Sequence, residues 1–329
     1  MDFTPLDVKS SYSLLKSPTR ISDLVTTAKE RGYKALALTD ENVLYGAVEF
    51  YNAAKKAGIK PIFGLRLVVA LNETDGTKLD LVFLAKNQRG YQHLMDLSTL
   101  QQTRKDKKAP LTVAQISPLL NELFIIIPPQ STVFSVLAQP TSILTELANL
   151  GDDDSVLLGV NSRLDDVQID TLQQLSKQLS LPLVGTSPVD YLNANDLFAS
   201  RVLQAIDAGV ELKDPTIEAE RRGQHYLHSK EQVIQDYKAK GLSAAAQKTV
   251  EVATLCNVEL QFRAPVLPHF KNQAGISSQQ YLRSLCIQGL KKRRVAPGKT
   301  IQQYQERLAM ELKIIHEMGF DDYFLIVWD

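Results

Sequence analysis

The sequence predicts an α/β fold, a distorted barrel of seven strands followed by a mostly helical segment. Seven apolar runs of strand length occur before residue 190, and amphipathic segments of helix length lie between them. Most of these runs are rich in Val, Ile, Leu and Phe, as expected of strands that are buried on both faces. After Leu212 the helical pattern continues without any further strand.

The predicted strands are residues 6–9, 35–39, 61–70, 79–85, 123–128, 156–160 and 181–186. Alternating strands and helices are typical of parallel strands joined by crossover helices. A doubly wound open sheet would show the same alternation. Only the count of seven favours a closed barrel.

The helices between these strands have recognisable ends. Residues 21–31 are followed by Gly32, and residues 46–56 by Ala57 and Gly58. Since glycine readily adopts the left-handed conformation that follows a helix, these glycines predict where the two helices end. The remaining predicted helices are residues 89–97, 112–120, 166–178, 196–207, 230–240, 243–256, 277–293 and 301–318.

A change of pattern predicts two domains, residues 1–262 and residues 263–329. The boundary falls between Val258 and Gly275, where the prolines of the segment 263–270 disfavour helix. The polar runs at residues 104–108 and 152–154 are expected in solvated loops.

The composition excludes some classes of protein. The 37 basic and 37 acidic residues leave no net charge, so a dominant basic face for nucleic acid is not indicated. No signal-peptide pattern and no apolar run long enough for a membrane span occurs, so we expect a cytoplasmic protein. Cys256 and Cys286 are the two cysteines, and we expect buried free thiols.

Three N-terminal motifs and one C-terminal motif carry a resemblance to a known family. They are LDVKSSYSLL at residues 6–15, ALALTDE at 35–41, GAVEFY at 46–51 and MGFDDYFLIVWD at 318–329. The sequence resembles the bacterial DNA polymerase III alpha subunits, the replicative C-family polymerases. The resemblance covers essentially the whole chain and implies an N-terminal PHP (polymerase and histidinol phosphatase) domain, followed by the start of the palm domain.

The resemblance also implies the positions of a metal cluster. Where metal-bearing members of the family have a His-x-x-x-His pair on the first strand, this chain has Pro5 and Lys9. Where they have Asp-His after the second strand, it has Asp40 and Glu41. Asp40 is the one ligand that matches.

The remaining mapped positions have also changed. The family's glutamate after the third strand corresponds to Arg66, and its histidine before the fourth run corresponds to Asp80. Asp80 begins its predicted strand, so its place in the cluster depends on the resemblance alone. The later Asp-Val-His-Tyr motif reads Pro188, Val189, Asp190, Tyr191 here.

The substituted residues predict a metal-free, catalytically inactive site. Proline has no donor, while lysine and arginine bring positive charge to the place of a cation. We expect a salt-bridge network in place of the metals, formed by Lys9, Asp40, Arg66, Asp80 and Asp190. The alternative is scattered charges at the barrel rim, each contributing little.

The five histidines lie outside the mapped positions: His93, His225, His228, His269 and His316. His225 and His228 have a spacing that could seat a metal, but without a third partner we interpret them as ordinary polar residues.

The C-terminal segment, by the resemblance, stops before the family's glycine-rich phosphate-contacting motif and its three catalytic aspartates. We therefore expect a truncated palm and no nucleotidyl transfer by this chain alone. The triplet 152–154 is not expected to be catalytic. The basic run 291–294 is interpreted as a solvated helix end, with contact to DNA phosphates as the alternative.

The favoured hypothesis is the N-terminal part of a template-directed DNA polymerase, with the PHP domain as a structural and interaction platform. The resemblance implies DNA, deoxynucleoside triphosphates and the sliding clamp as partners, Mg²⁺ in the downstream palm, and an exonuclease contact through the PHP domain. The alternatives are a metal-dependent phosphoesterase, such as a 3′-5′ proofreading nuclease, and a histidinol-phosphatase-like enzyme.

Overall fold

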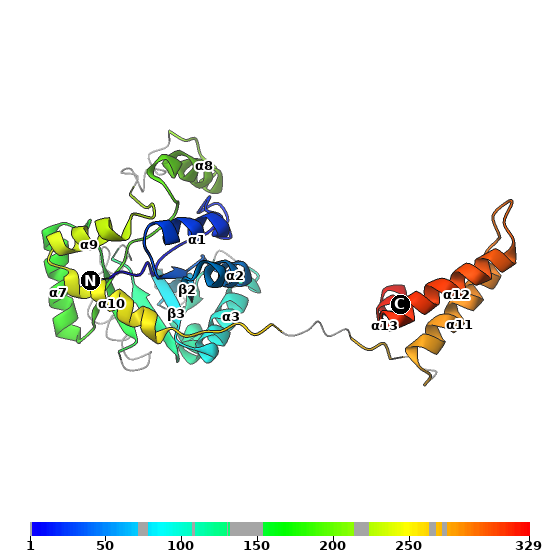
Figure 1. Cartoon of the computed structure of the whole chain (residues 1–329). Helices are drawn as coiled ribbons and strands as arrows, with labels where there is room; N and C mark the ends of the chain where they lie inside the picture. The colour runs from blue at the N-terminus through cyan, green and yellow to red at the C-terminus, as the bar shows by residue number, and fades with distance from the viewer. Residues whose placement is uncertain are drawn as a thin grey trace. The chain divides into compact units, whose positions relative to one another are not determined.

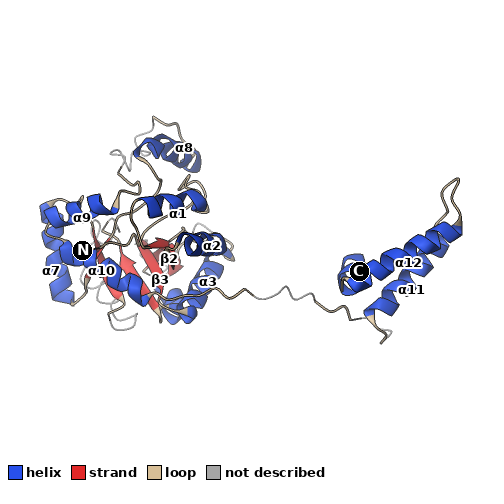
Figure 2. Ribbon diagram, in the orientation of Figure 1, coloured by secondary structure: helices blue, strands red, loops and turns tan. Residues whose placement is uncertain are grey.

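Six of the seven predicted strands form one sheet, which Figure 2 shows in red among the helices. The structure, a computed structural model, describes residues 2–71, 78–106, 109–129, 131, 154–213, 224–262, 268–271 and 275–329. In spatial order the strands are β1 (Ala35–Leu38), β2 (Lys60–Ala70), β3 (Lys78–Ala85), β5 (Leu123–Ile127), β6 (Val156–Val160) and β7 (Leu183–Gly185). A short strand that was not predicted, β4 (Leu111–Thr112), pairs with β2.

The N-terminal segment closes this sheet into a distorted barrel. On one side it joins β1, because Ala37 N–H donates to Pro5 O at 3.0 Å and Thr39 N–H donates to Val8 O at 2.8 Å. On the other side Val8 forms a parallel bridge with Val189, just after β7. The predicted fold class is confirmed, although residues 6–9 form an isolated bridge and not a regular strand.

The expectation of parallel strands throughout was wrong for β3. This strand pairs antiparallel with β2, from Gly64 opposite Leu84 to Ala70 opposite Lys78, and antiparallel with β5. The connection between β2 and β3 spans residues 71–77, which is shorter than the dozen or so residues that a parallel crossover needs. The start of β3 therefore lies at the same end of the barrel as the end of β2.

Helices surround the sheet in the first unit, Met1–Leu260 (Figure 1). They are α1 (Ile21–Glu30), α2 (Ala47–Ala57), α3 (Gln88–Gln102), α4 (Val113–Ile116), α7 (Asp166–Leu179), α8 (Leu197–Ala208), α9 (Lys230–Ala239) and α10 (Ser243–Leu255). Among the described residues, Ser117–Leu119 and Ala194–Asp196 form 3₁₀ helices. Helix α2 ends at Gly58, whose φ of 75° is left-handed, as predicted from the glycine.

The barrel interior is packed with side chains. Inward-facing residues such as Leu6, Ala37 and Ile62 form one apolar cluster together with Val252 and Cys256 at the end of α10. Cys256 is a buried free thiol, as expected, and burial raises the pKa of this thiol to about 12.

The second unit, Gln261–Asp329, contains α11 (Ser278–Lys292), α12 (Ile301–Glu317) and α13 (Asp321–Trp328). Helix α13 was not predicted as a separate element. It packs against α11, and Asp322 in its first turn accepts hydrogen bonds from Ser278 Oγ and from Phe270 N–H at 3.1 Å. Cys286 on α11 is half-buried, which corrects the expectation that both thiols are buried.

Candidate functional site

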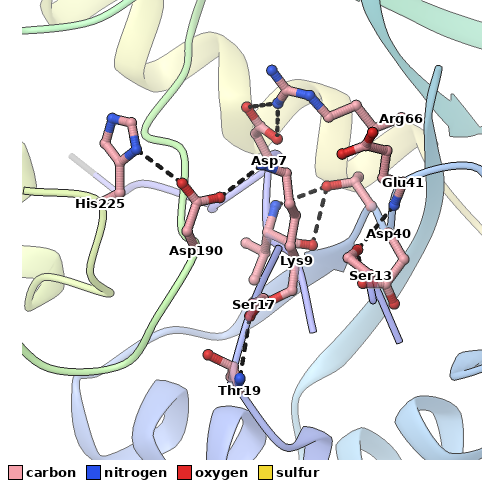
Figure 3. A network of polar contacts seen from close by, with 12 residues as sticks. Asp7, Lys9, Ser13, Ser17, Thr19, Asp40, Glu41, Arg66, Asp190 and His225 are labelled. Carbon is pink, nitrogen blue, oxygen red and sulfur yellow. Dashed lines mark hydrogen bonds and ion pairs between the residues drawn. The ribbon is translucent and has the colours of Figure 1, made fainter. Parts of the chain in front are cut away.

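The structure brings the mapped charged residues together, and Figure 3 shows four of them, Lys9, Asp40, Arg66 and Asp190. Lys9 follows the bridge residue Val8, Asp40 follows β1, and Asp190 follows β7. Arg66 and Asp80 lie on the paired strands β2 and β3, where Asp80 is opposite Val68. The antiparallel direction of β3 explains why Asp80, at the start of its strand, joins residues at the ends of others.

Lys9 and Asp190 form an ion pair at the centre of the site. Lys9 Nζ lies 2.8 Å from Asp190 Oδ1, and the two side chains are only 15% and 13% exposed. The other carboxylate oxygen, Asp190 Oδ2, lies 2.9 Å from His225 Nδ1. Asp190 therefore joins the N-terminal segment to the chain around residue 225, whose backbone O accepts from Asp190 N–H.

Arg66 forms the second ion-paired group. Its Nη1 donates to both carboxylate oxygens of Asp7 at 2.7 Å, while Nε donates to Asp80 Oδ1 at 2.9 Å and Nη2 to Asp80 Oδ2. Asp7 is almost fully buried, with 2% of its side chain exposed. One planar guanidinium thus connects the N-terminal segment, β2 and β3, a geometry that arginine permits and lysine does not.

Asp40 is stabilised differently from the network that the sequence predicted. Its carboxylate accepts from Ser10 N–H and Ser10 Oγ, both at 2.7 Å, and from Ser13 Oγ at 2.6 Å. Among the described residues, Asp40 has these serine contacts and forms no ion pair with Lys9 or Arg66. The backbone N–H of the neighbouring residue Glu41 donates to Ser13 Oγ at 2.9 Å. The backbone of Glu41 also forms an isolated parallel β-bridge with that of Arg66.

The pKa shifts follow from burial and pairing. Burial alone would lower the pKa of Lys9, but the charges of Asp190 and Asp7 and the hydrogen bond to Asp190 together outweigh it and raise that pKa. Burial would raise the pKa of Asp190, yet Lys9 and His225 hold it well below the usual range. For Arg66, the attraction of Asp7 and Asp80 exceeds the burial effect, and its pKa is raised. Each of these three groups is therefore charged at neutral pH.

Asp40 has the opposite shift. Burial raises its pKa, and the hydrogen bonds from Ser13 and Ser10 offset only part of that effect. Its charge is compensated by dipoles and not by a cation, which explains why its pKa moves in the direction opposite to that of Asp190.

The residues present do not fit a metal cluster. Pro5 and Pro188 are buried and offer no side-chain donor. The ammonium of Lys9 and the guanidinium of Arg66 hold the carboxylates that could otherwise coordinate an ion. Within the described ranges, no group of three or more His, Cys, Asp or Glu side chains is arranged to hold a metal ion.

Sequence reasoning missed two partners, Asp7 and His225. Asp7 could have been found, since residues two apart in an extended segment lie on the same face, and Asp7 precedes Lys9 by two. His225 was interpreted as an ordinary polar residue, whereas it contacts Asp190, 35 residues earlier in the chain. His228 stacks on Tyr226 with ring centroids 3.8 Å apart, and burial lowers its pKa.

The other sequence candidates lie away from this site. Asp152 and Asp153 lie outside the described residues, and Asp154 is exposed. Lys291 and Lys292 are in the last turn of α11, and Arg293 follows as its C-terminal cap, all of them exposed. This agrees with the predicted solvated helix end, and contact of this run with DNA stays the untested alternative.

Comparison with known proteins shows which protein families parts of this chain resemble. Residues 5–145 match the sequence model of the PHP domain, and residues 280–329 match that of the bacterial DNA polymerase III alpha NTPase domain. Residues 5–145 are therefore similar to PHP domains. Two solved structures are similar over part of it, an amidohydrolase from Chromobacterium violaceum (TM-score 0.40, 12% identity, 57% of this chain and 87% of that one) and a putative metal-dependent phosphoesterase from Bifidobacterium adolescentis (0.38, 12%, 56% and 86%).

The curated relatives narrow this class. DNA polymerase III alpha subunits of Halalkalibacterium halodurans and Bacillus subtilis are 35% and 33% identical over 100% of this chain, which covers 29% of each. The Borreliella burgdorferi subunit is 30% identical over 99% of this chain and 30% of its own length. Over its whole length the chain is similar to DNA polymerase III alpha subunits, and it spans about three tenths of the length of these relatives. No helix among the described residues is long and apolar enough to cross a membrane.

Proposed function

We propose that this chain is the N-terminal part of a template-directed DNA polymerase of bacterial chromosome replication, and that its PHP domain is metal-free and inactive. One observation supports the second part most strongly. At the positions mapped to metal ligands, Lys9 is ion-paired with Asp190, and Arg66 is ion-paired with Asp7 and Asp80. These cations occupy the places where the family's ligands would hold positive ions.

The charge balance argues against a phosphoesterase. Three carboxylates, those of Asp7, Asp80 and Asp190, are paired with the two cations Lys9 and Arg66, and a fourth, that of Asp40, accepts hydrogen bonds from Ser10 and Ser13. A nuclease must attract a phosphodiester and stabilise the negative charge that develops on it. A net negative cluster without a metal would repel that substrate.

The same contacts support a structural role. The ion pairs connect the N-terminal segment, which closes the barrel beside Val189, with β2, β3 and the chain after β7. In this proposal, ion pairs perform the crosslinking that metal coordination performs in metal-bearing relatives. The domain then serves as a platform that braces the polymerase and contacts other replisome subunits, including the sliding clamp or an exonuclease.

The polymerase activity belongs, in this proposal, to the longer protein in the cytoplasm. Its substrates are DNA and deoxynucleoside triphosphates, and Mg²⁺ held by the palm aspartates supplies the two-metal chemistry. The 329 residues alone are inactive, because those aspartates lie outside them. Reading the gene beyond Asp329 tests this part. A glycine-rich motif followed by three aspartates supports it, and a stop codon directly after Asp329 contradicts it.

Metal analysis of the purified chain tests the inactive PHP domain. After incubation with Zn²⁺ or Mn²⁺ and gel filtration, we expect no stoichiometric metal and no cleavage of single-stranded DNA. A PHP protein that retains the family's histidines is the positive control. One or more equivalents of bound metal, together with nuclease activity that chelation removes, would establish the phosphoesterase alternative instead.

A further inference from the structure

The chain carries no net charge, but one segment of it lacks acidic residues altogether. No Asp or Glu occurs between Glu259 and Glu306, although the whole chain has 37 of them. The basic residues of this segment are Arg263, Lys271, Arg283, Lys291, Lys292, Arg293, Arg294 and Lys299. Residues 260–305 are therefore a locally positive segment, which the balanced total conceals. This charge pattern belongs to the segment itself, whatever residues follow Asp329.

Five of these basic residues lie together in the turn between α11 and α12, which we call the basic turn (residues 291–300). They are Lys291, Lys292, Arg293, Arg294 and Lys299, and all of them are exposed. The backbone of the turn has a hydrogen bond of its own, since Lys299 N–H donates to Ala296 O at 3.1 Å. Thr300 then caps α12 in a capping box with Gln303. The basic turn thus presents its cations on a hydrogen-bonded backbone.

None of the five basic side chains of this turn forms an ion pair with another residue in the part of the chain that the structure describes. The basic residues of α12 differ, because each has a carboxylate one helical turn away. Arg307 Nε lies 2.6 Å from Glu311 Oε1. Lys313 Nζ lies 3.7 Å from Glu317 Oε1. The unpaired positive charge of this helical hairpin is therefore concentrated in the basic turn.

Helix stability accounts for only part of the basic turn. Lys291 and Lys292 lie in the last turn of α11, where the helix dipole favours cations. Arg294 lies beyond that helix, and Lys299 directly precedes the N-cap residue Thr300, where the dipole of α12 disfavours a cation. The like charges within residues 291–299 also repel one another. A ligand that bears several negative charges would relieve this repulsion.

We propose that the basic turn binds the phosphate backbone of duplex DNA, without regard to base sequence. The choice of DNA rests on the proposed function, whereas the charge pattern does not. A duplex carries about one negative charge per 1.7 Å of its axis, so several cations in one turn can contact more than one phosphate. Residues 291–300 include no aromatic residue, so the turn lacks the stacking platform that is typical of single-strand binding. Contacts of Lys and Arg with phosphates position a protein on DNA and carry no sequence information.

Removal of the two cations that lie outside the helices tests this site in the 329-residue chain. Fluorescence anisotropy with a short labelled duplex at low salt measures the affinity. The double variant Arg294→Gln with Lys299→Gln should bind at least about tenfold more weakly than the parent chain, and the slope of log affinity against log salt should become shallower by about two. Two duplexes of unrelated sequence should bind the parent chain equally.

Two control variants separate the position of the charge from its amount. Lys56→Gln with Lys177→Gln removes the same charge from exposed positions on α2 and α7, and should keep both the affinity and the slope. Arg294→Lys with Lys299→Arg keeps the charge of the basic turn and should bind like the parent chain. Circular dichroism verifies that helix content is unchanged in all variants.

Three results would overturn the inference. An equal loss of affinity in the two Gln double variants would mean that net charge, and not the basic turn, attracts DNA. Tighter binding of a poly-glutamate of equal charge than of the duplex would assign the turn to an acidic polypeptide. Absence of DNA binding by the parent chain would exclude the site, but would leave the proposed polymerase to be judged by the gene sequence beyond Asp329.

Discussion

Replacing Lys9 with alanine tests whether the ion pairs stabilise the barrel. Lys9 Nζ lies 2.8 Å from Asp190 Oδ1, and both side chains are at least five-sixths buried. Alanine removes the cation and leaves the Asp190 carboxylate in a site of low polarity. Its remaining partner is His225, 2.9 Å from the other oxygen.

The expected cost follows from this geometry. Removing one partner of a buried ion pair costs about 3 to 5 kcal/mol of unfolding free energy. Since His225 remains and the site is slightly exposed, we expect the lower end, about 3 kcal/mol. For a domain of this size that corresponds to a fall in melting temperature of about 6 to 12 °C.

Urea unfolding followed by circular dichroism measures this difference. Lys34→Ala is the matched control, because Lys34 Nζ lies 3.8 Å from Asp2 Oδ2 and its side chain is 83% exposed. That variant should be indistinguishable from the parent chain. In a double-mutant cycle, Lys9→Ala and Asp190→Asn should be strongly non-additive, since each removes the same interaction.

The pH dependence adds a sign to this prediction. Because the pKa of Asp190 is lowered in the folded state, its ionisation stabilises the fold at pH values above the pKa of an aspartate in the unfolded chain. This stabilisation is lost as the pH falls through the folded-state pKa. Because the pKa of Lys9 is raised in the folded state, its charged form stabilises the fold at pH values below the pKa of a lysine in the unfolded chain. This stabilisation is lost as the pH rises through the folded-state pKa. The parent and Lys9→Ala should therefore differ most between about pH 4 and pH 10. A stability change equal to that of Lys34→Ala across this range would refute the reasoning.

Three further variants test the rest of the site. Arg66→Met leaves the buried Asp7 carboxylate without its cation and should lower the unfolding free energy, measured in urea, by about 3 to 5 kcal/mol. Arg66→Lys should not restore the stability, because lysine cannot bind both carboxylates as arginine does. A smaller decrease in unfolding free energy than that of Lys9→Ala would contradict the proposed geometry. The raised pKa of Asp40 means that its charged form opposes folding above that pKa, so stability rises as pH falls through it, and Asp40→Asn should flatten this part of the pH profile. His225→Gln should cost only about 1 kcal/mol alone, but more when Lys9 is also alanine; additive losses would show that the two do not share Asp190.

The sequence by itself determined the elements that depend on local pattern. Six of the seven apolar runs form the strands of the sheet, and Gly58 ends α2, because burial on both faces and left-handed backbone leave signals within a few residues. The family motifs at residues 6–15 and 318–329 also need no structure to be seen. The first of these motifs places Lys9 at a position where the resemblance implies a metal ligand.

Only the tertiary structure decided which charges meet. Asp80 reaches Arg66 because β3 runs antiparallel, and periodicity does not encode strand direction. Arg66 forms its ion pair with Asp7, whereas Asp40 accepts hydrogen bonds from serine hydroxyls, since the length and orientation of each side chain select its partner. His225 joins Asp190 only where two segments distant in the sequence are paired. The sequence thus predicted the composition of the site, while its connections follow from strand direction and side-chain geometry.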